Sequence, residues 1–491
     1  MFEFNKKRVI LSVCAAVIFS LDFLFVRTAQ LISDCFGHLS VSQLFFHLIV
    51  PMKRAETAVF MNKLNMVFVL TACILAAALV LFYFAFKFIL KSRKKTFILQ
   101  TFWIITGVVT IISYALFNEK IPFSDFLNMV QSTEMFTEHF ANVPVKQVKF
   151  PVKRNVILLI VESLEESYEH SEVAGENLIP ELTNIRKQNL SFSRQVQPNG
   201  TEWTLAALAG IFYGIPQLPL VNMVWANQEN NRSYNCNSIF HYFLDAGYNC
   251  TYMQGGHMSF AGKSNLFINL PEVNIISYDQ LCKDPVFQKN TKPFSWGVDD
   301  EVLFRHLYKE TERCAAGDKP FFISLLTLDT HEPNGYIPPD RFSEEDSFYA
   351  QVMKNADRRI SEFVKWVSRQ EFAKDTTLII VGDHLAMKNE FLSSLRKFNG
   401  GNIINGKRRA YNCFINPAKN PAKSENRIFS AFDLMPTILH AAGAEWGTDK
   451  MNLGVSVFGE IPTLLEKNGI GWYETHSRRF QKKYIDLLEF H

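Results

Sequence analysis

The sequence predicts an α/β protein with a mainly parallel central sheet, preceded by an N-terminal region of transmembrane helices. Two patterns carry this prediction. Before residue 118 the chain contains three long apolar runs, each about the ~20 residues that a helix needs to cross a bilayer. After residue 155, short and wholly apolar runs alternate with longer amphipathic segments, which is the order expected when parallel strands are joined by helices.

The composition limits the classes of function. The chain has 491 residues, a formal net charge of +3 and 48% hydrophobic residues, with 45 phenylalanines. This length exceeds that of one small domain. The nearly balanced charge argues against a nucleic acid partner, because proteins that bind nucleic acids usually carry strongly basic surfaces.

The three apolar runs cover residues 9–26, 66–86 and 97–117. Two of them carry no charge, and only Ser12, Ser20 and Asp22 interrupt the first. Buried core helices would explain all three runs, and a cleaved signal peptide would explain the first alone. No clear small-x-small cleavage site follows the first run, and two further long runs come after it. We therefore favour three membrane spans.

Lysines and arginines predict the orientation of these spans. One cluster, Lys6 to Arg8, precedes the first span, and a second, Lys91 to Lys95, separates the second from the third. The positive-inside rule places both clusters in the cytoplasm and the rest of the chain outside it. A hairpin in the third run would reverse this assignment, and the loop after the first span is also basic, at Arg27, Lys53, Arg54 and Lys63.

These patterns divide the chain into four parts. We expect a transmembrane anchor over residues 1–118, a juxtamembrane connector over 119–154, an extracytoplasmic catalytic domain over 155–445 and a C-terminal extension over 446–491. Of the eight cysteines, Cys236 and Cys250 flank one helix-like segment. An oxidising compartment would permit them to pair, but the sequence leaves the connectivity open.

Three buried strands are expected after residue 155, at 156–161, 321–328 and 376–381, because each run is apolar throughout. A helix with one apolar stripe is expected over 348–372. Ligands of open parallel sheets bind at the carboxyl ends of the strands. The polar residues that follow the three strands are therefore expected to meet: Glu162 after the first, Asp329 and His331 after the second, and Asp383 with His384 after the third.

The candidate nucleophile is Thr204, at the end of the polar segment Asn-Gly-Thr-Glu-Trp-Thr over residues 199–204. A small apolar run follows it over 205–210, which predicts a loop that enters a helix with Thr204 at or near the N-cap. The free backbone N–H groups and the helix dipole favour an alkoxide there and the anion that it attacks. A plain capping role for Thr204 is the alternative.

The expected cluster suits a divalent cation. Burying a carboxylate or an imidazole without a partner is costly, and a shared cation would be a natural partner for Glu162, Asp383 and His384. With the Thr204 oxygen as fourth ligand, the set is rich in oxygen with one nitrogen. Such a set suits Mn²⁺ or Mg²⁺ and also admits Zn²⁺. Taken singly, each residue also fits a structural role, such as a helix cap or a core histidine.

Three further residues are candidate substrate contacts. His331 is expected to hold a phosphoryl oxygen or to protonate a leaving alkoxide. Asp329 is expected to orient His331 or to bind a polar substrate. Lys263 follows the glycine-rich turn over 255–257 and could grip a phosphate as a point charge, although most such lysines are solvated.

Taken together, these residues resemble the membrane-bound phosphoglycerol transferases of the alkaline phosphatase/sulfatase superfamily, with the lipoteichoic acid synthases as more distant relatives. The resemblance covers about residues 155–443 and implies an alkaline phosphatase-like sandwich, with the anchor in the bacterial inner membrane and the catalytic domain in the periplasm. It rests on Val161-Glu162-Ser163, Gly200 to Thr204, Asp329-Thr330-His331 and Asp383 to Met387.

The resemblance also implies an activity. In that family a threonine takes a phosphoglycerol group from phosphatidylglycerol and passes it to a glycan hydroxyl. Thr204 matches this nucleophile, and His331 matches the histidine that contacts the phosphoryl group. Lys263 falls where lipoteichoic acid synthases carry an arginine, and Trp203, in the nucleophile motif, is expected at the substrate. The ligands of the metal ion, usually manganese, are matched by Glu162, Asp383 and His384.

Two other functions stay open. Phosphoethanolamine transferases that act on lipopolysaccharide use a similar mechanism, but they usually show Gly-Glu-Thr after the first strand and a cysteine near the nucleophile. This chain has Val161-Glu162-Ser163 and no nearby cysteine. A non-catalytic, membrane-anchored binding protein is the other alternative, and the complete set of metal ligands argues against it.

Overall fold

The protein is described from a computed structural model. Its described residues are 6–36, 43–44, 58–121, 128, 131–170, 175–218, 234–289, 296–331, 335–338, 342–343, 347–386, 408–423 and 425–488. The chain forms two compact units. The first comprises Met1–Val41 and Glu56–Leu127, and the second comprises Ser42–Ala55 and Asn128–His491.

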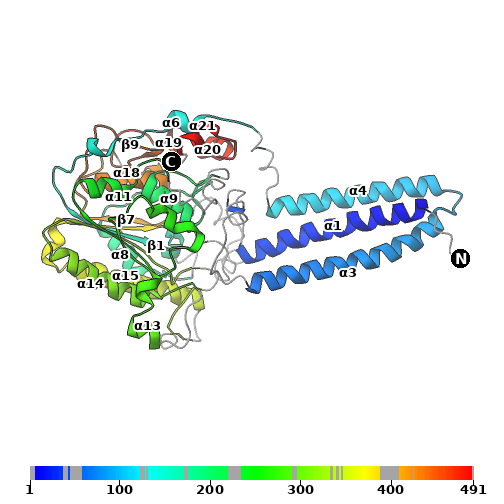
Figure 1. Ribbon diagram of the computed structural model, residues 1–491, viewed down its shortest axis with the longest axis horizontal. Helices are drawn as coiled ribbons and strands as arrows, with labels where there is room; N and C mark the ends of the chain where they lie inside the picture. Colours follow the sequence, from blue (N-terminus) through cyan, green and yellow to red (C-terminus); the bar gives the residue numbers. More distant parts are fainter. Residues whose placement is uncertain are drawn as a thin grey trace. The chain divides into compact units, whose positions relative to one another are not determined.

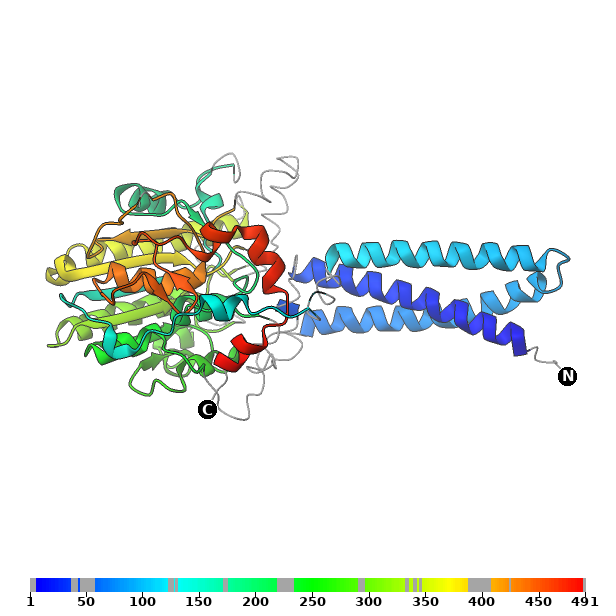
Figure 2. The same cartoon turned by 90° about the horizontal axis from the view of Figure 1, so that it is seen from above.

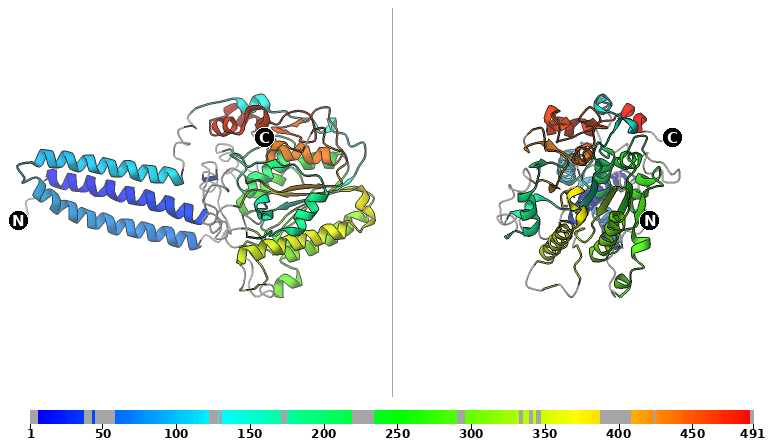
Figure 3. Two further views of the ribbon diagram at one scale, coloured as in Figure 1. Left: turned by 180° about the vertical axis from the view of Figure 1, so that it is seen from behind. Right: turned by 90° about the vertical axis from the view of Figure 1, so that its left-hand side faces the viewer.

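The first unit consists of long apolar helices that lie side by side (Figure 3, left). Three stretches are long and apolar enough to cross a membrane, Lys6–Asp34, Phe60–Ile89 and Lys95–Lys120, and they contain all three predicted spans. The first helix packs against both of the others, and its Asp22 accepts a hydrogen bond from Thr110 at 2.9 Å. The helices are α1 (Lys6–Phe36), α3 (Ala58–Ile89) and α4 (Lys95–Lys120).

The second unit is built on a six-stranded sheet with the order β4-β3-β5-β1-β6-β7. All neighbouring strands pair in parallel except β7, which runs antiparallel to β6. The predicted mainly parallel sheet is therefore confirmed. The strands are β1 (Asn155–Val161), β3 (Asn249–Gln254), β4 (Asn274–Ile276), β5 (Phe321–Leu326), β6 (Thr376–Gly382) and β7 (Asn412–Ile415).

Helices cover both faces of this sheet (Figure 1). Side chains of β1 alternate between two cores: Val156, Leu158 and Ile160 pack in one, and the residues between them pack in the other. This is why β1 is apolar at every position rather than at every second one. The first core is covered by α9 (Thr204–Tyr213), α11 (Ile239–Asp245) and α18 (Ala431–Ala441), and the second by α8 (Pro180–Gln188), α14 (Asp300–Ala315) and α15 (Phe348–Val367).

The N- and C-terminal segments of the second unit pack together (Figure 2, cyan and red). Thr133 donates its backbone N–H to Phe480 at 2.8 Å, and Ala141 exchanges backbone hydrogen bonds with Asn452. Phe136 lies in the first core with Tyr473 and Tyr484. The described parts of the expected connector and C-terminal extension thus belong to the same unit as the sheet, and the domain boundaries stay predictions.

Shorter elements complete the described chain. They are α6 (Met135–His139), η1 (Val145–Gln147), η2 (Glu166–Glu169), β2 (Arg194–Gln195), η4 (Phe260–Phe267), α12 (Tyr278–Leu281), α13 (Pro285–Lys289), η6 (Glu371–Asp375), β8 (Ile428–Phe429), β9 (Lys450–Met451), β10 (Gly454–Val455), α19 (Leu464–Asn468), α20 (Ile470–Ser477) and α21 (Lys482–Leu488).

Two elements are shorter than the sequence predicted, and the structure answers the question of cysteine pairing. The helix expected over 348–372 ends at Val367. The strand expected over 321–328 ends at Leu326. The two residues beyond it are buried in a loop, where Asp300 accepts the backbone N–H of Leu328 at 2.8 Å. Cys236 and Cys250, which the sequence left open as a pair, are both free.

Candidate active site

The register between β1 and β6 brings the first ligands together. Val161 pairs with Gly382, so the next residues, Glu162 and Asp383, leave the sheet side by side at its carboxyl edge. Gly382 allows this approach, because a Cβ atom there would come within 1.9 Å of the Leu164 carbonyl oxygen. One ligand atom from each of Glu162, Asp383 and His384 lies within 4.8 Å of the others, and all three residues are buried.

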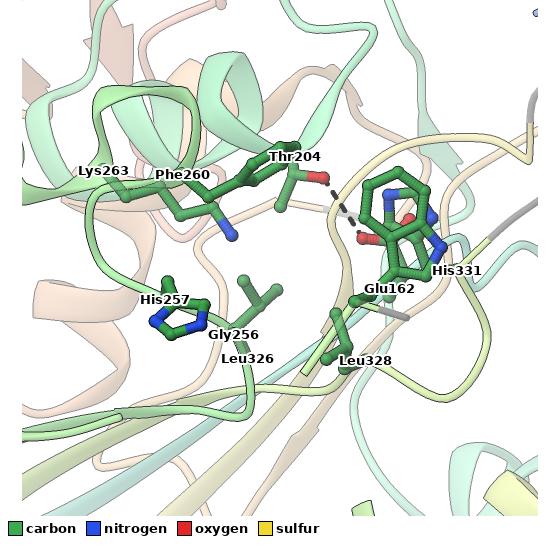
Figure 4. A pocket seen from close by; sticks show the side chains of 10 residues that line it. Glu162, Thr204, Gly256, His257, Phe260, Lys263, Leu326, Leu328 and His331 are labelled. Atoms are coloured by element: carbon green, nitrogen blue, oxygen red, sulfur yellow. Dashed lines mark hydrogen bonds between the residues drawn. The ribbon is translucent and has the colours of Figure 1, made fainter. Parts of the chain in front are cut away.

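Thr204 reaches this cluster from a different part of the chain. It is the first residue of α9, and Trp203 is the N-cap residue, without a side-chain cap. The Thr204 hydroxyl lies 3.1 Å from Glu162 Oε2 (Figure 4). It also lies 3.4 Å from His384 Nε2. Four side chains from three segments of the chain therefore meet at one point, as the sequence predicted.

The helix behind Thr204 is fixed by close packing. All residues of α9 from Leu205 to Tyr213 are buried, and the helix lies against α18. Gly210 permits this approach, because a Cβ atom there would come within 2.9 Å of the Ala431 carbonyl carbon. Gly214 ends the helix in the left-handed conformation, with a φ of 63°. The nucleophile candidate is thus carried by a rigid element.

Ser163 orients two of the ligands. Its hydroxyl donates to Glu162 Oε1 at 2.7 Å, and its backbone N–H donates to Asp383 Oδ1 at 2.8 Å. Its φ is 56°, a left-handed conformation that costs a non-glycine residue of order 1–3 kcal/mol. Strain of this kind is concentrated at functional sites.

The protonation states in the cluster are strongly coupled. Burial raises the pKa of Glu162, but the neighbouring His384 and His331 outweigh this and hold the pKa below its usual value. Burial and the charge of Glu162 raise the pKa of Asp383 to about 7. Burial lowers the pKa of His384, while Asp383 and Glu162 raise it, to about 10 overall. Two carboxylates and one imidazole are thus held in contact away from water.

These residues fit a divalent cation. Asp383 Oδ2 is buried and has no hydrogen-bond partner among the described residues. Nδ1 of His384 lies 3.0 Å from the Leu385 carbonyl oxygen, which orients the ring and leaves Nε2 directed at the cluster. A cation would satisfy Asp383 and offset the repulsion between the two carboxylates. The oxygen-rich donor set with one nitrogen suits Mn²⁺, Mg²⁺ or Zn²⁺.

A pocket opens beside the cluster (Figure 4). His331 and Lys263 line it together with Glu162 and Thr204. The Trp296 ring packs against His331 with ring centroids 4.2 Å apart and the two planes tilted by 36°. The remaining lining residues are Gly256, His257, Phe260, Leu326 and Leu328.

Lys263 is buried, with only 5% of its surface exposed. Burial lowers its pKa to about 8, although Glu162 and Asp383 act in the opposite direction. The structure gives its ammonium group no hydrogen bond or ion pair with a described residue, and the group lies 5.6 Å from the centre of the Phe260 ring. A buried cation that faces a pocket is suited to an anionic ligand.

Two predicted substrate contacts do not line this pocket. Trp203 is 4% exposed and precedes α9. Asp329 is buried, and its Oδ1 accepts the backbone N–H of Asp300 at 2.9 Å, while Asp300 accepts the N–H of Asp329 at 3.0 Å. These bonds hold the loop that carries His331 against the start of α14, and the orientation of His331 by Asp329 stays a prediction. Substrate contact by either residue stays a prediction.

Other contributions to the site were not predicted. Trp296 and Phe260 line the pocket, but a lone aromatic residue in a loop carries no distinctive sequence pattern. Residues of the C-terminal segment hold the loop before Thr204 in place. Asn199 in this loop accepts a hydrogen bond from the Tyr473 hydroxyl at 3.0 Å, and it donates hydrogen bonds to Glu474 and Ser477. The separation of about 275 residues hides this contact from any local motif.

The sheet order and the strand-end cluster place the chain in the alkaline phosphatase-like class of α/β folds. A family model described as Sulfatase matches residues 154–444, more than half of the chain. The protein therefore belongs to the sulfatase family, as its resemblance to phosphoglycerol transferases of that superfamily led us to expect.

The curated relatives that the chain resembles carry a more specific name than the family does. Phosphoglycerol transferase I from Salmonella choleraesuis (strain SC-B67) is 27% identical over 278 residues, which cover 53% of this chain and 34% of that protein. The protein of the same name from Salmonella typhi matches equally. The match thus spans about a third of the length of these relatives.

Two solved structures also match the chain at low sequence identity. The lipoteichoic acid synthase LtaP from Listeria monocytogenes has a TM-score of 0.49 and 16% identity, and the match covers 64% of this chain and 79% of that one. The lipooligosaccharide phosphoethanolamine transferase EptA from Neisseria meningitidis has a TM-score of 0.48 and 11% identity, over 88% and 84% of the two chains.

Proposed function

We propose that the protein is a membrane-bound transferase that moves a phosphoglycerol group from phosphatidylglycerol to a glycan hydroxyl in the periplasm or at the cell surface. The convergence of the Thr204 hydroxyl with Glu162, Asp383 and His384 carries this proposal. The similarity to phosphoglycerol transferase I supports a phosphoryl-group transferase.

In the proposed reaction, the Thr204 oxygen attacks the phosphorus of the donor. A Thr204–phosphorus ester bond forms as the phosphorus–oxygen bond to diacylglycerol breaks. A divalent cation held by Glu162, Asp383 and His384 would lower the pKa of the Thr204 hydroxyl and offset the charge of the phosphoryl oxygens. The free N–H groups at the start of α9 favour the same anion.

The proton balance assigns a role to His331. Thr204 loses its hydroxyl proton to solvent before it attacks, and the diacylglycerol oxygen gains a proton as it leaves. We assign that donation to His331, which lines the pocket with Thr204. In the second half of the reaction, the acceptor hydroxyl attacks the same phosphorus and passes its proton to His331, which restores the proton that His331 gave away. The bond between phosphorus and Thr204 breaks, and the Thr204 oxygen regains a proton from solvent.

The charge of the pocket favours glycerol as the transferred head group. Among the described residues that line the pocket, Glu162 is the only carboxylate, and the proposed metal already uses it. A glycerol head group is neutral and accepts hydrogen bonds from Lys263, whereas an ammonium group would be repelled by that lysine. Ethanolamine stays the second candidate because the faces of Trp296 and Phe260 suit an ammonium ion.

The anchor suits a lipid donor. Helices that cross the membrane hold an enzyme in the bilayer where its donor resides, which raises the effective concentration of that donor. We propose that these helices lie in the inner membrane and that the second unit lies on the extracytoplasmic side. The excess of lysine and arginine before the first span and between the last two supports this orientation.

Diacylglycerol release tests the proposal. The purified full-length protein is incubated with Mn²⁺ and either labelled phosphatidylglycerol or labelled phosphatidylethanolamine. We expect release from phosphatidylglycerol by the wild type and by Thr475→Ala, a control at an exposed threonine of α20, and none by Thr204→Ala. Release by Thr204→Ala equal to that of the wild type would refute the proposed nucleophile. Release from phosphatidylethanolamine alone would select the second candidate.

A further inference from the structure

One end of the first unit is strongly basic. Lys6, Lys7 and Arg8 begin α1, Lys87 lies in the last turn of α3, and four more cations follow at Lys91, Arg93, Lys94 and Lys95. The sequence contains no aspartate or glutamate over residues 6–21 or 64–118. These cations therefore face no carboxylate from the neighbouring turns of their own helices.

A groove of about 800 Å³ lies at this end. One face of α4 forms most of it: Thr96, Leu99, Gln100, Trp103 and Ile104 recur at the spacing of a single helical stripe. Leu90 adds an apolar side chain, and Lys7 and Lys95 contribute the charges. Along this face of α4, the side chains are polar near Lys95 at the basic end and become apolar toward Ile104. We call this site the basic groove.

The two lysines of the basic groove are available to a ligand. Arg8, by contrast, stacks on Tyr83 at 4.1 Å and donates a hydrogen bond to its hydroxyl. The structure gives the ammonium groups of Lys7 and Lys95 no hydrogen bond or ion pair with a described residue. The N-terminus of α4 also begins at Lys95, and its dipole adds positive potential at the same end.

We propose that the basic groove is a binding site for an anionic glycerophospholipid. The phosphate lies at Lys7 and Lys95, and an acyl chain lies along Leu99, Trp103 and Ile104. Basic pockets between membrane helices are suited to anionic lipid head groups. A zwitterionic lipid carries a phosphate too, but its ammonium group would be repelled by the eight cations. The site lies wholly within the first unit, involves no reaction and is independent of the proposed function.

Native mass spectrometry of the full-length protein tests this site. The Thr204→Ala background prevents turnover of any bound donor, and the probes are phosphatidylglycerol and phosphatidylcholine with identical acyl chains. The test variant is Lys7→Gln with Lys95→Gln. The control is Lys91→Gln with Arg93→Gln, which removes the same charge from the same end but does not alter the groove lining.

We expect the first phosphatidylglycerol to bind more tightly than phosphatidylcholine. Its affinity should fall about 25-fold in the test variant, because each lysine near a membrane surface contributes about fivefold. The control should lose less than about threefold. Equal losses in the two variants would mean general charge attraction and would overturn the site. Unchanged affinity in the test variant would overturn it as well.

A photo-crosslinking residue gives a second readout that does not depend on affinity. A benzophenone side chain in place of Gln100 should crosslink phosphatidylglycerol in preference to phosphatidylcholine. The same side chain in place of Ile105, an exposed residue of α4 outside the groove lining, should show no such preference. Equal crosslinking of both lipids at Gln100 would contradict the proposal.

Discussion

The side-chain oxygen of Thr204 lies 3.1 Å from Oε2 of Glu162, although the two residues are 42 positions apart in the chain. One residue begins a buried helix and the other follows a buried strand. Neither element can shift easily, because both are packed into the first core. The contact is therefore preorganised, which is what covalent catalysis by a weak nucleophile needs.

Ser163 should control the affinity for metal. Ser163→Ala and Ser163→Gly both remove the hydroxyl that donates to Glu162 Oε1. Loss of such an orienting contact typically lowers metal affinity about 10–100-fold, so we expect a similar loss in both variants by calorimetric titration with Mn²⁺. The glycine variant should also be more stable than the alanine variant by about 1 kcal/mol, because only glycine adopts the φ of 56° without strain. Unchanged affinity in both variants would contradict this role.

Metal binding should release protons. In the protein without metal, the pKa of His384 is raised to about 10 and that of Asp383 to about 7, and both groups must be deprotonated to bind a cation. At pH 7 we expect about one to two protons to be released per Mn²⁺ bound. The affinity should rise as the pH rises from about 6 to 9. Calorimetry in buffers of different ionisation enthalpy measures the number of protons released per Mn²⁺ bound. A metal affinity that does not change with pH would count against Asp383 and His384 as ligands.

Lys263 should link donor binding to pH. In the protein without metal, burial lowers the pKa of Lys263 to about 8. A cation bound to Glu162 and Asp383 would lower this pKa further, so the charge of Lys263 is lost by the time the pH has risen through about 8. We expect the KM for phosphatidylglycerol to rise as the pH increases through about 8, and Lys263→Arg to remove this dependence because arginine stays charged. If Lys263→Arg shows the same rise, another group is responsible.

The same lysine should lower the stability of the fold. Below pH 8 both the folded and unfolded states bind the proton, and the folded state must bury the charge. Between about 8 and the ordinary value of 10.5, the unfolded state binds more protons, so stability rises with pH. Lys263→Met should therefore raise the free energy of unfolding at pH 7 by about 1–3 kcal/mol while donor binding is lost. Denaturant unfolding of the protein without metal provides the measurement.

The C-terminal segment should support the nucleophile loop. Tyr473→Phe removes the hydroxyl that donates to the Asn199 carbonyl oxygen, which should lower stability by about 1 kcal/mol and reduce kcat several-fold. Tyr484→Phe is the matched control, because the buried Tyr484 hydroxyl has no hydrogen-bond partner among the described residues. Tyr484→Phe should leave stability and kcat nearly unchanged. An equal loss of kcat in the two variants would contradict the proposed support of the nucleophile loop by Tyr473.

Much of the site could be predicted from the sequence because its ligands directly follow buried strands. Glu162 and Asp383 each come after a run that is apolar at every position, and parallel strands end at a common edge. Hydropathy indicates which residues are buried but not which of them pair with a neighbouring strand. For this reason the strand predicted over 321–328 extends two residues beyond the end of β5 at Leu326. The strained Ser163, the ring contact of Trp296 with His331 and the contact from Tyr473 depend on the assembled structure, and no local sequence pattern indicates them.

The central claim is that Thr204 becomes covalently linked to the transferred group, and mass spectrometry of the peptide that contains Thr204 tests it most directly. The full-length protein is mixed with phosphatidylglycerol and Mn²⁺ without an acceptor, then quenched in acid and digested. We predict one glycerophosphoryl group on Thr204, absent when Mn²⁺ is chelated. An unmodified Thr204 peptide in a sample that has released a stoichiometric amount of diacylglycerol would contradict the account.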